Sequence, residues 1–273
     1  DDLGNHQQAI KDYDKAISLK PQFAEAYVNR GIAYDSLENY QQAITDYDTA
    51  IKLSPQHVMA YYNRGITYRK LGNYQQAIKD FDKAIRLNPQ DVDAYVNRAA
   101  AYKDLGNYQQ AITDIDTAIK LNPQDADAYY NRGAYYSNFG NKKQSITDYD
   151  KAIVLNPQFA KAYYNRGNAY YELGSKLQAI KDYDKVIELN PQNAKAYNNR
   201  GISYSDLGNE QRAINDYDKA IELNPQFADT YYNLARTYIR LGNRNMAILN
   251  LKNAAKLGHE KAQNLLRSEG IEY

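Results

Sequence analysis

The residues of this sequence that could do chemistry are carboxylates, arginines, asparagines and three histidines. His6, His57 and His259 are far apart in the chain, and the 273 residues include no cysteine. A disulfide, a thiolate metal site and a cysteine nucleophile are therefore excluded. No HExxH, GxSxG, GxGxxG or P-loop motif is present. We expect no catalytic residues, no metal site and no cofactor, and we predict that the protein is not an enzyme.

The polar residues recur through the chain, which distinguishes them from a catalytic pair. The stretch AYYNRG at Ala60–Gly65 returns unchanged at Ala128–Gly133 and Ala162–Gly167, and near-copies occur elsewhere. A pair of catalytic acids would be expected to occur once. What asparagine and arginine offer in every copy is hydrogen bonding, so these residues are candidates either for packing or for recognition.

Seven prolines set the period of the chain, because they lie 34 residues apart at positions 21, 55, 89, 123, 157, 191 and 225. A fixed period of this length indicates stacked helical repeats. Counting each unit from the third residue after its proline gives seven repeats: 24–57, 58–91, 92–125, 126–159, 160–193, 194–227 and 228–261. We predict a partial repeat at 1–23, a capping helix at 262–273 and one continuous solenoid domain.

Each repeat is predicted to hold two helices, here named helix A and helix B. Glycine at repeat position 15, such as Gly72, suits the left-handed residue that ends helix A, whereas Glu38 at that position should strain its turn. Asn73 and Gln76 form a capping-box pattern at the start of helix B. The proline at position 32 ends helix B. With the end segments, the pattern predicts about sixteen helices.

The apolar positions carry a recognisable pattern: an aromatic residue at position 4, a small residue at 8, Tyr at 11, Ala at 20, an aromatic residue at 24, Ala at 27 and Pro at 32. In the second repeat these are Tyr61, Gly65, Tyr68, Ala77, Phe81, Ala84 and Pro89. The pattern resembles the tetratricopeptide repeat (TPR). The resemblance implies an all-α fold, a right-handed α-solenoid or TPR superhelix of antiparallel helix pairs, with the A helices on its concave face. Departures are local: Ile115 and Leu251 at position 24, and Ser145 at position 20.

Helical phase places the arginine of each repeat between its two helices. At 100° per residue, arginine at position 7 and aspartate at position 23 both lie at the margin of an apolar stripe. We predict a contact in the pairs Arg30/Asp46, Arg64/Asp80, Arg98/Asp114, Arg132/Asp148, Arg166/Asp182 and Arg200/Asp216. In the seventh repeat Leu234 and Asn250 replace both charges together. The aspartates at position 25, such as Asp48 and Asp82, lie farther round the helix and are expected to be solvated.

The asparagine at position 6 points away from the core by the same phase. The column consists of Asn29, Asn63, Asn97, Asn131, Asn165, Asn199 and Asn233. The amides could bond a neighbouring helix and align the stack, or they could pair with the main chain of an extended peptide. The column is similar to the asparagine ladder in the TPR domain of O-GlcNAc transferase, and that resemblance implies peptide binding at these seven positions.

Other side chains are predicted to flank this column in the groove. They are Tyr62, Tyr130, Tyr164 and Tyr232 at position 5, Asn168 at position 9, and Arg69, Lys70 and Lys103 at positions 12 and 13. Tyrosines beside amides would make a floor for a peptide, although the rings could pack on the next repeat instead. The three cations form a basic cluster that could meet a carboxylate, or a solvated surface.

The sequence favours a protein–protein interaction scaffold that binds an extended peptide or partner segment. Alternatives are a substrate-recruiting or assembly fragment of a larger enzyme or secretion machine, and a module that self-associates through its uncapped N-terminal end. A net charge of +1 and the absence of long apolar runs argue against nucleic-acid and membrane partners. No signal peptide is visible, so we expect a cytoplasmic location, and loss of a leader by truncation stays open.

Overall fold

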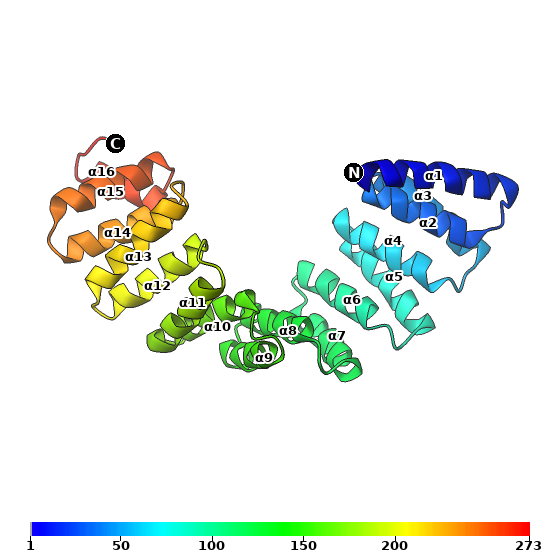
Figure 1. Cartoon of the computed structure of the whole chain (residues 1–273), viewed down its shortest axis with the longest axis horizontal. Helices are drawn as coiled ribbons and strands as arrows, with labels where there is room; N and C mark the ends of the chain where they lie inside the picture. The colour runs from blue at the N-terminus through cyan, green and yellow to red at the C-terminus, as the bar shows by residue number, and fades with distance from the viewer. Residues whose placement is uncertain (1) are drawn as a thin grey trace. The chain divides into compact units, whose positions relative to one another are not determined.

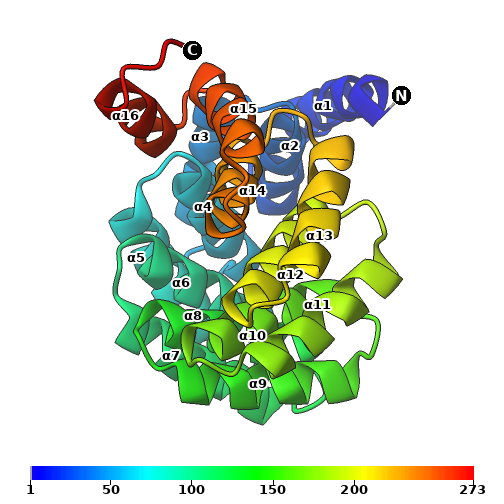
Figure 2. The ribbon, with the colours of Figure 1, turned by 90° about the vertical axis from the view of Figure 1, so that its left-hand side faces the viewer.

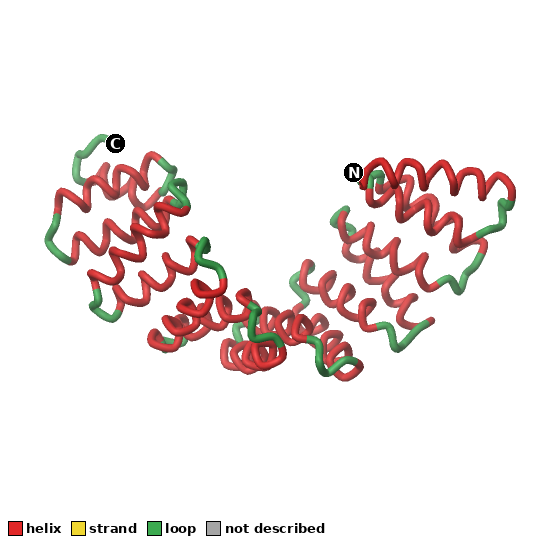
Figure 3. Tube along the Cα trace, viewed as in Figure 1, coloured by secondary structure: helices red, strands yellow, loops and turns green. Residues whose placement is uncertain are grey.

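The computed structural model describes residues 2–273, which form sixteen α-helices and no strand (Figure 1, Figure 3). The helices are α1 (Asp2–Leu19), α2 (Ala24–Ser36), α3 (Tyr40–Leu53), α4 (Val58–Lys70), α5 (Tyr74–Leu87), α6 (Val92–Asp104), α7 (Tyr108–Leu121), α8 (Ala126–Asn138), α9 (Lys142–Leu155), α10 (Ala160–Glu172), α11 (Lys176–Leu189), α12 (Ala194–Asp206), α13 (Glu210–Leu223), α14 (Ala228–Arg240), α15 (Arg244–Lys256) and α16 (Glu260–Ser268). From α2 to α15, the even-numbered helices are the A helices and the odd-numbered helices are the B helices. The all-α fold of antiparallel helix pairs is therefore as the sequence predicts.

The chain divides into two compact units, Asp1–Phe139 and Gly140–Tyr273, with the boundary between α8 and α9 of the fourth repeat. Within each unit, every helix packs against the next one along the chain. In the first unit α2 also contacts α4, and α4 contacts α6; in the second, α10 contacts α12, and α12 contacts α14. The A helices of each unit therefore form one surface, called here the A-helix face. The single continuous domain stays a prediction.

The core of each repeat is a close contact between position 8 of helix A and position 24 of helix B. A Cβ atom added to Gly65 would lie 2.8 Å from Cε1 of Phe81, which is itself fully buried. The repeats that carry alanine at position 8 have a smaller partner there: Ala99 accompanies Ile115, and Ala235 accompanies Leu251. The two positions thus share a fixed volume, as expected for a close-packed interior.

The turns between helices A and B use the left-handed conformation. Glycine at position 15 has positive φ throughout, as at Gly72 with 76°, and Glu38 adopts a φ of 60° in the first repeat. That value is unfavourable for a side chain, so the expected strain at Glu38 is present. Among the described residues, Glu38 is the only one other than glycine with positive φ.

The capping-box expectation at the start of helix B is wrong for Asn73. The Asn73 side chain accepts no hydrogen bond from its helix, and its ψ is 61°. Asn141 and Asn243, with ψ of 72° and 79°, do accept the backbone N–H three residues on, at 3.2 Å. A cap of this kind needs a more extended backbone, which the tight turn before α5 does not provide.

The last helix begins two residues earlier than expected, at Glu260 instead of 262. The turn before it lacks the proline of the other repeats, and Gly258 adopts a φ of 88° there. His259 then caps the helix, because its Nδ1 accepts the Ala262 N–H at 3.2 Å. Figure 2 shows α16 beside α15, against which Ala262 and Leu266 are buried.

Candidate functional site

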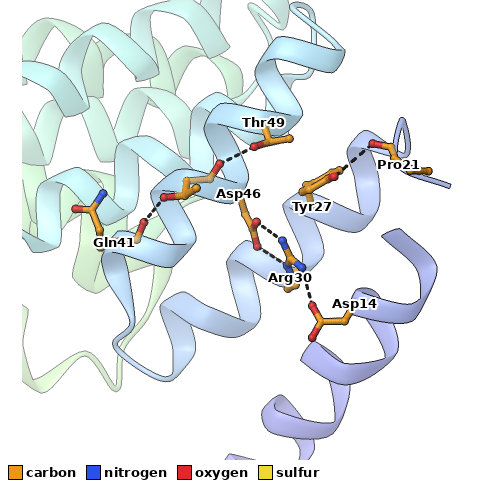
Figure 4. Close-up of polar contacts among 8 residues, drawn as sticks. Asp14, Pro21, Tyr27, Arg30, Gln41, Asp46 and Thr49 are labelled. Carbon is orange, nitrogen blue, oxygen red and sulfur yellow. Dashed lines mark hydrogen bonds and ion pairs between the residues drawn. The ribbon is translucent and has the colours of Figure 1, made fainter. Parts of the chain in front are cut away.

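In five of the seven repeats, an arginine forms a two-pronged hydrogen bond with helix B of the same repeat. Figure 4 shows Arg30 donating from Nε and Nη2 to the two carboxylate oxygens of Asp46, at 2.8 and 2.6 Å. The same fork joins Arg64 to Asp80, Arg98 to Asp114, Arg166 to Asp182 and Arg200 to Asp216, at 2.5–2.9 Å. The Arg132–Asp148 pair would join the two units and stays a prediction.

The sequence analysis expected the aspartates at position 25 to be solvated. In the structure, those up to Asp184 also accept hydrogen bonds from an arginine. Nη1 of Arg30 reaches Asp14 of the preceding B helix at 2.6 Å (Figure 4). Asp48 and Asp82 likewise accept hydrogen bonds from the next arginine along, both at 2.5 Å. Helical phase placed these carboxylates farther round helix B than the aspartate of the fork, but it could not show that the arginine of the next repeat lies beside them. Each of these arginines, on helix A, therefore bonds helix B of its own repeat and the B helix that precedes it.

Burial distinguishes the two carboxylates that one arginine holds. The side chain of Asp80 is 4% exposed, whereas that of Asp48 is 54% exposed. Burial raises the pKa of Asp80, and the hydrogen bond and charge of Arg64 offset part of that rise. The arginine thus compensates a desolvated carboxylate inside the repeat, and its role is structural.

The asparagine column lies on the A-helix face and is not sealed in the core. Asn29 is exposed, and the other six asparagines are half-buried. Asn63 donates only to the carbonyl oxygen of Met59, one turn back in its own helix, at 2.9 Å. Asn131 makes no side-chain hydrogen bond to any residue within 2–273. These amides keep hydrogen-bonding capacity for another molecule.

Two asparagines of the column are held by the tyrosine at position 5 of the preceding repeat. Asn97 Nδ2 donates to the Tyr62 hydroxyl, and Asn199 Nδ2 donates to the Tyr164 hydroxyl, both at 3.0 Å over a sequence separation of 35 residues. Both interpretations of the column thus have a physical basis, since the amides align neighbouring A helices and also lie on an accessible face. Tyr130 and Asn165 are half-buried on α8 and α10.

The predicted flanking tyrosines also pack on neighbouring rings. The rings of Tyr62 and Phe81 meet edge-on with centroids 6.0 Å apart, and those of Tyr164 and Tyr183 are 6.1 Å apart. Tyr232 stacks on the imidazole of His259 at 4.2 Å. The sequence analysis assigned no role to His259, although its position directly before the last helix could have identified it as a cap.

The three cations predicted to flank the groove are paired with aspartates. Lys70 binds Asp35 of the preceding A helix, and Arg69 binds Asp104 of the following one at 2.9 Å. Lys103 binds Asp104 as well. Burial alone would raise the pKa of Asp104, but the two cations lower it below its ordinary value. Arg69 and Lys70 therefore link A helices, and all three cations offer a partner less free positive charge than the sequence suggested.

A cavity of about 280 Å³ opens on the A-helix face of the second unit. It lies between the fifth and sixth repeats and is lined by Asn168, Tyr171, Glu172, Tyr183, Asn199 and Ile202. Asn168, predicted to flank the column, accepts the Tyr183 hydroxyl at 2.8 Å and Asn199 Nδ2 at 3.0 Å. The cavity therefore brings the column together with one predicted flanking residue.

The site offers hydrogen bonding and shape to a partner. Within residues 2–273, no three His, Cys, Asp or Glu side chains gather as they would around a metal ion. None of the described helices has both the length and the hydropathy that crossing a bilayer requires.

Family comparison agrees with the repeat period. Profiles described as tetratricopeptide repeat match residues 24–57, 58–91, 92–125, 160–193 and 194–227, and also 115–147 and 216–249. A profile described as TPR repeat matches residues 2–38 and 140–174. Comparison with curated proteins gives no significant match.

Solved structures similar to this chain are themselves TPR solenoids. A structure of MamA is 28% identical, with a TM-score of 0.58 over 63% of this chain and 94% of MamA. YrrB, described as a TPR protein with an unusual peptide-binding site, is 26% identical, with a TM-score of 0.58 over 67% of this chain and 95% of YrrB. A tetratricopeptide repeat protein from Parabacteroides merdae, 22% identical, has a TM-score of 0.67 over 89% and 97% of the two chains and supports the fold alone.

Proposed function

Because this chain belongs to the tetratricopeptide repeat family, we propose that it binds an extended segment of a partner protein along its A-helix face, through the asparagine column. The fold and the likeness to MamA and YrrB support a protein–protein interaction scaffold. TPR proteins are generally scaffolds and not enzymes, and we infer the same role here.

The observation that carries the proposal is how the amide of Asn97 is bonded. Both of its N–H groups are used, one on the Tyr62 hydroxyl and one on the Asp93 carbonyl oxygen. Its Oδ1 atom accepts no hydrogen bond from any described residue. A held amide with an open oxygen is an acceptor for the main-chain N–H of an extended peptide, whatever the sequence of that peptide.

The amides of the column differ in what they would offer. Asn63 keeps one N–H and its oxygen, so it could act as donor and acceptor. Asn199 donates both N–H groups to Tyr164 and Asn168, and its oxygen accepts one bond from Asn198 at 3.0 Å, which leaves one lone pair. Main-chain pairing at several such positions would supply affinity, and the side chains between them would supply selectivity.

Self-association end to end is less favoured by the contacts at α16. Where the A helices of the repeats carry aromatic and small residues toward helix B, α16 carries Gln263 and Arg267. The corresponding side chain at position 24 of α1 is Tyr13, which needs a small residue opposite, as Gly31 provides for Tyr47. An arginine is larger than the glycine or alanine that the repeats have there, so we infer that α16 of one copy complements α1 of another poorly.

Peptides selected from a random library displayed on phage test the proposal on the full chain. Asn63→Ala combined with Asn131→Ala should weaken selected peptides at least about tenfold, since two main-chain hydrogen bonds are lost. The melting temperature should stay nearly unchanged, because neither amide bonds another helix and alanine favours a helix.

Asn215→Ala is the matched control, because Asn215 is an exposed asparagine on helix B of the sixth repeat, bonded only to Gln211. It should leave peptide affinity unchanged. Equal affinity for the double variant and the parent chain would contradict the role of the column.

A further inference from the structure

The cavity between the fifth and sixth repeats departs from the repeat pattern at one residue. Position 9 is apolar in five of the other six repeats, and it is Asn168 in the fifth. The apolar residues are Ile32, Ile66, Ala100, Ala134 and Ile202, and the seventh repeat has Arg236. The fifth repeat alone has an amide at position 9, and this amide lies beside a cavity, where one side chain of a bound segment could be selected.

Counting hydrogens shows what the cavity lacks. The Tyr183 hydroxyl hydrogen is donated to Asn168, and both N–H groups of Asn199 are donated to Tyr164 and Asn168. The Tyr171 hydroxyl hydrogen is donated to Asp206 at 2.7 Å. The hydroxyl oxygens of Tyr171 and Tyr183 and the amide oxygen of Asn199 keep lone pairs. Asn168 Oδ1, in contrast, already accepts two hydrogen bonds, and the Asn168 amide adds two N–H donors. With the Glu172 carboxylate, the lining offers more acceptor oxygens than donors, and its complement is a ligand with several N–H groups.

Two carboxylates lie near the cavity, and each also pairs with a lysine; the partner of Asp206 is Lys176, at 3.6 Å. Glu172 lines the cavity with a 51% exposed side chain and binds Lys142 through Oε2 at 2.7 Å. Asp206 stands behind Tyr171, and burial together with this carboxylate raises the pKa of Tyr171 to about 12. The hydroxyl therefore stays protonated, with its hydrogen directed at Asp206 and its oxygen available to a donor.

We propose that this cavity binds a basic side chain, an arginine guanidinium, of the partner segment; the proposal rests on the proposed function, which brings such a segment to the A-helix face. A guanidinium presents five N–H donors in a plane and stacks on aromatic rings, which suits dispersed acceptors beside Tyr171 better than the compact ammonium of lysine. The volume of about 280 Å³ is below the roughly 300–1,000 Å³ of pockets for whole small molecules, so it suits one side chain.

The test uses N-acetyl-arginine amide as the probe and the isotope-labelled full chain. We expect the probe to shift the side-chain amide NMR signals of Asn168 and Asn199 saturably. N-acetyl-citrulline amide, which is neutral but nearly the same shape, should bind about tenfold more weakly, because charged hydrogen bonds are the stronger ones. Glu172→Gln should weaken the arginine probe severalfold.

Glu188→Gln is the matched control, since Glu188 is an exposed carboxylate of the same repeat that pairs with Lys185 and does not line the cavity. It should leave the affinity for the arginine probe unchanged. Equal affinity for the arginine and citrulline probes, or no saturable shift at tens of millimolar, would overturn the proposal. Asn168→Ile, which copies Ile66 and Ile202, should abolish the shift of Asn199 while the other α10 signals stay in place.

The outcome is separable from that of the proposed function. Displayed peptides that bind without any preference for arginine, together with a silent probe, would remove the basic-side-chain site and leave the extended segment standing. If the probe binds this cavity while no displayed peptide binds the chain, the basic-side-chain site stands and the binding of an extended segment is contradicted.

Discussion

The sixth and seventh repeats are neighbours in the second unit and fill the same space between helices A and B with different side chains. In the sixth repeat, Arg200 forks onto Asp216 and also reaches Asp184 of the fifth repeat at 2.6 Å. In the seventh, Leu234 is 3% exposed, and Asn250 donates to the carbonyl oxygen of Met246 in its own helix. A charged pair and a largely apolar pair thus hold equivalent helices together.

A second pair of positions changes between the same two repeats. The sixth has Gly201 against Tyr217, and the seventh has Ala235 against Leu251. In the first case both charges are lost together, and in the second a gain in volume on helix A is matched by a loss on helix B. The comparison shows that each repeat is specified by coupled pairs, and that the arginine is needed because a buried aspartate faces it, and not because the fold demands a charge.

The largest effect is expected when one partner of the charged pair is removed. Arg200→Ala leaves the Asp216 carboxylate, 7% exposed, without its cation, and should destabilise α12 and α13 by about 3 kcal/mol. Hydrogen exchange of these helices is the suitable measurement, since repeat arrays unfold locally as well as globally. A change below about 1 kcal/mol would mean that water compensates the carboxylate.

Placing the residues of the seventh repeat in the sixth should destabilise the chain much less than Arg200→Ala does. Arg200→Leu with Asp216→Asn removes both charges, and the new amide can donate to the Arg212 carbonyl oxygen as Asn250 does to that of Met246. We expect at least half of the loss caused by Arg200→Ala to be recovered, because no unpaired charge stays buried. Urea unfolding of the parent, single and double variants measures the difference. A double variant as unstable as the single one would show that the bond to Asp184 matters more than the fork.

Much of this architecture could be predicted from the sequence, because the period and the helical phase are local properties. The prolines 34 residues apart gave the number of helices, and the joint loss of charge at Leu234 and Asn250 indicated that arginine and aspartate face each other. Helical phase gives the direction of a side chain within its own helix, but it does not predict which residues of the neighbouring repeat lie next to it. The contact of Arg64 with Asp48 and that of Asn97 with Tyr62 were for this reason not foreseen.

The candidate site was less predictable than the fold for the same reason. The seven asparagines could be picked out as a column, but Asn97, Asn199 and Asn233 each have a hydrogen-bond partner 35 residues away on another helix. The cations Arg69 and Lys70 seemed free because Asp104 and Asp35 belong to other repeats. The cavity beside Asn168 depends on side chains from three helices and has no local signature.

The next largest effect is expected at the close contact between Gly201 and Tyr217. A Cβ atom at Gly201 would lie 2.8 Å from Cε1 of Tyr217 and 3.2 Å from the Ala213 carbonyl oxygen. Gly201→Ala should therefore destabilise the chain by about 1–3 kcal/mol through overpacking. Adding Tyr217→Leu, which copies the seventh repeat, should make the alanine favourable relative to glycine in that background. The free energy of unfolding of all four members of the cycle tests the coupling, and additive effects would refute it.

A smaller and stabilising effect is expected at Thr230 in the seventh repeat. Its side chain is fully buried, and its hydroxyl has no hydrogen-bond partner among the described residues. The other six repeats have alanine at this position. Thr230→Val keeps the shape and removes the unsatisfied hydroxyl, so it should raise stability by about 1 kcal/mol. A loss of stability on thermal unfolding would indicate that the hydroxyl finds a partner in solution.

The smallest effect concerns Asp218, the position-25 carboxylate that faces the seventh repeat. Its counterparts up to Asp184 bind the arginine of the next repeat, but Leu234 stands there instead. Asp218 is exposed, and partial desolvation raises its pKa above the ordinary value, with no cation to oppose it. The folded state then binds the proton more tightly than the unfolded state, so this group favours folding more as the pH falls through its raised pKa. Leu234→Arg with Asn250→Asp would restore the fork and bring a guanidinium to Asp218, so the pKa of Asp218, followed by NMR through its carboxyl carbon, should fall. An unchanged pKa would mean that the new arginine bonds the new carboxylate of its own repeat without contacting Asp218. The contact within a repeat would then form independently of the contact between repeats.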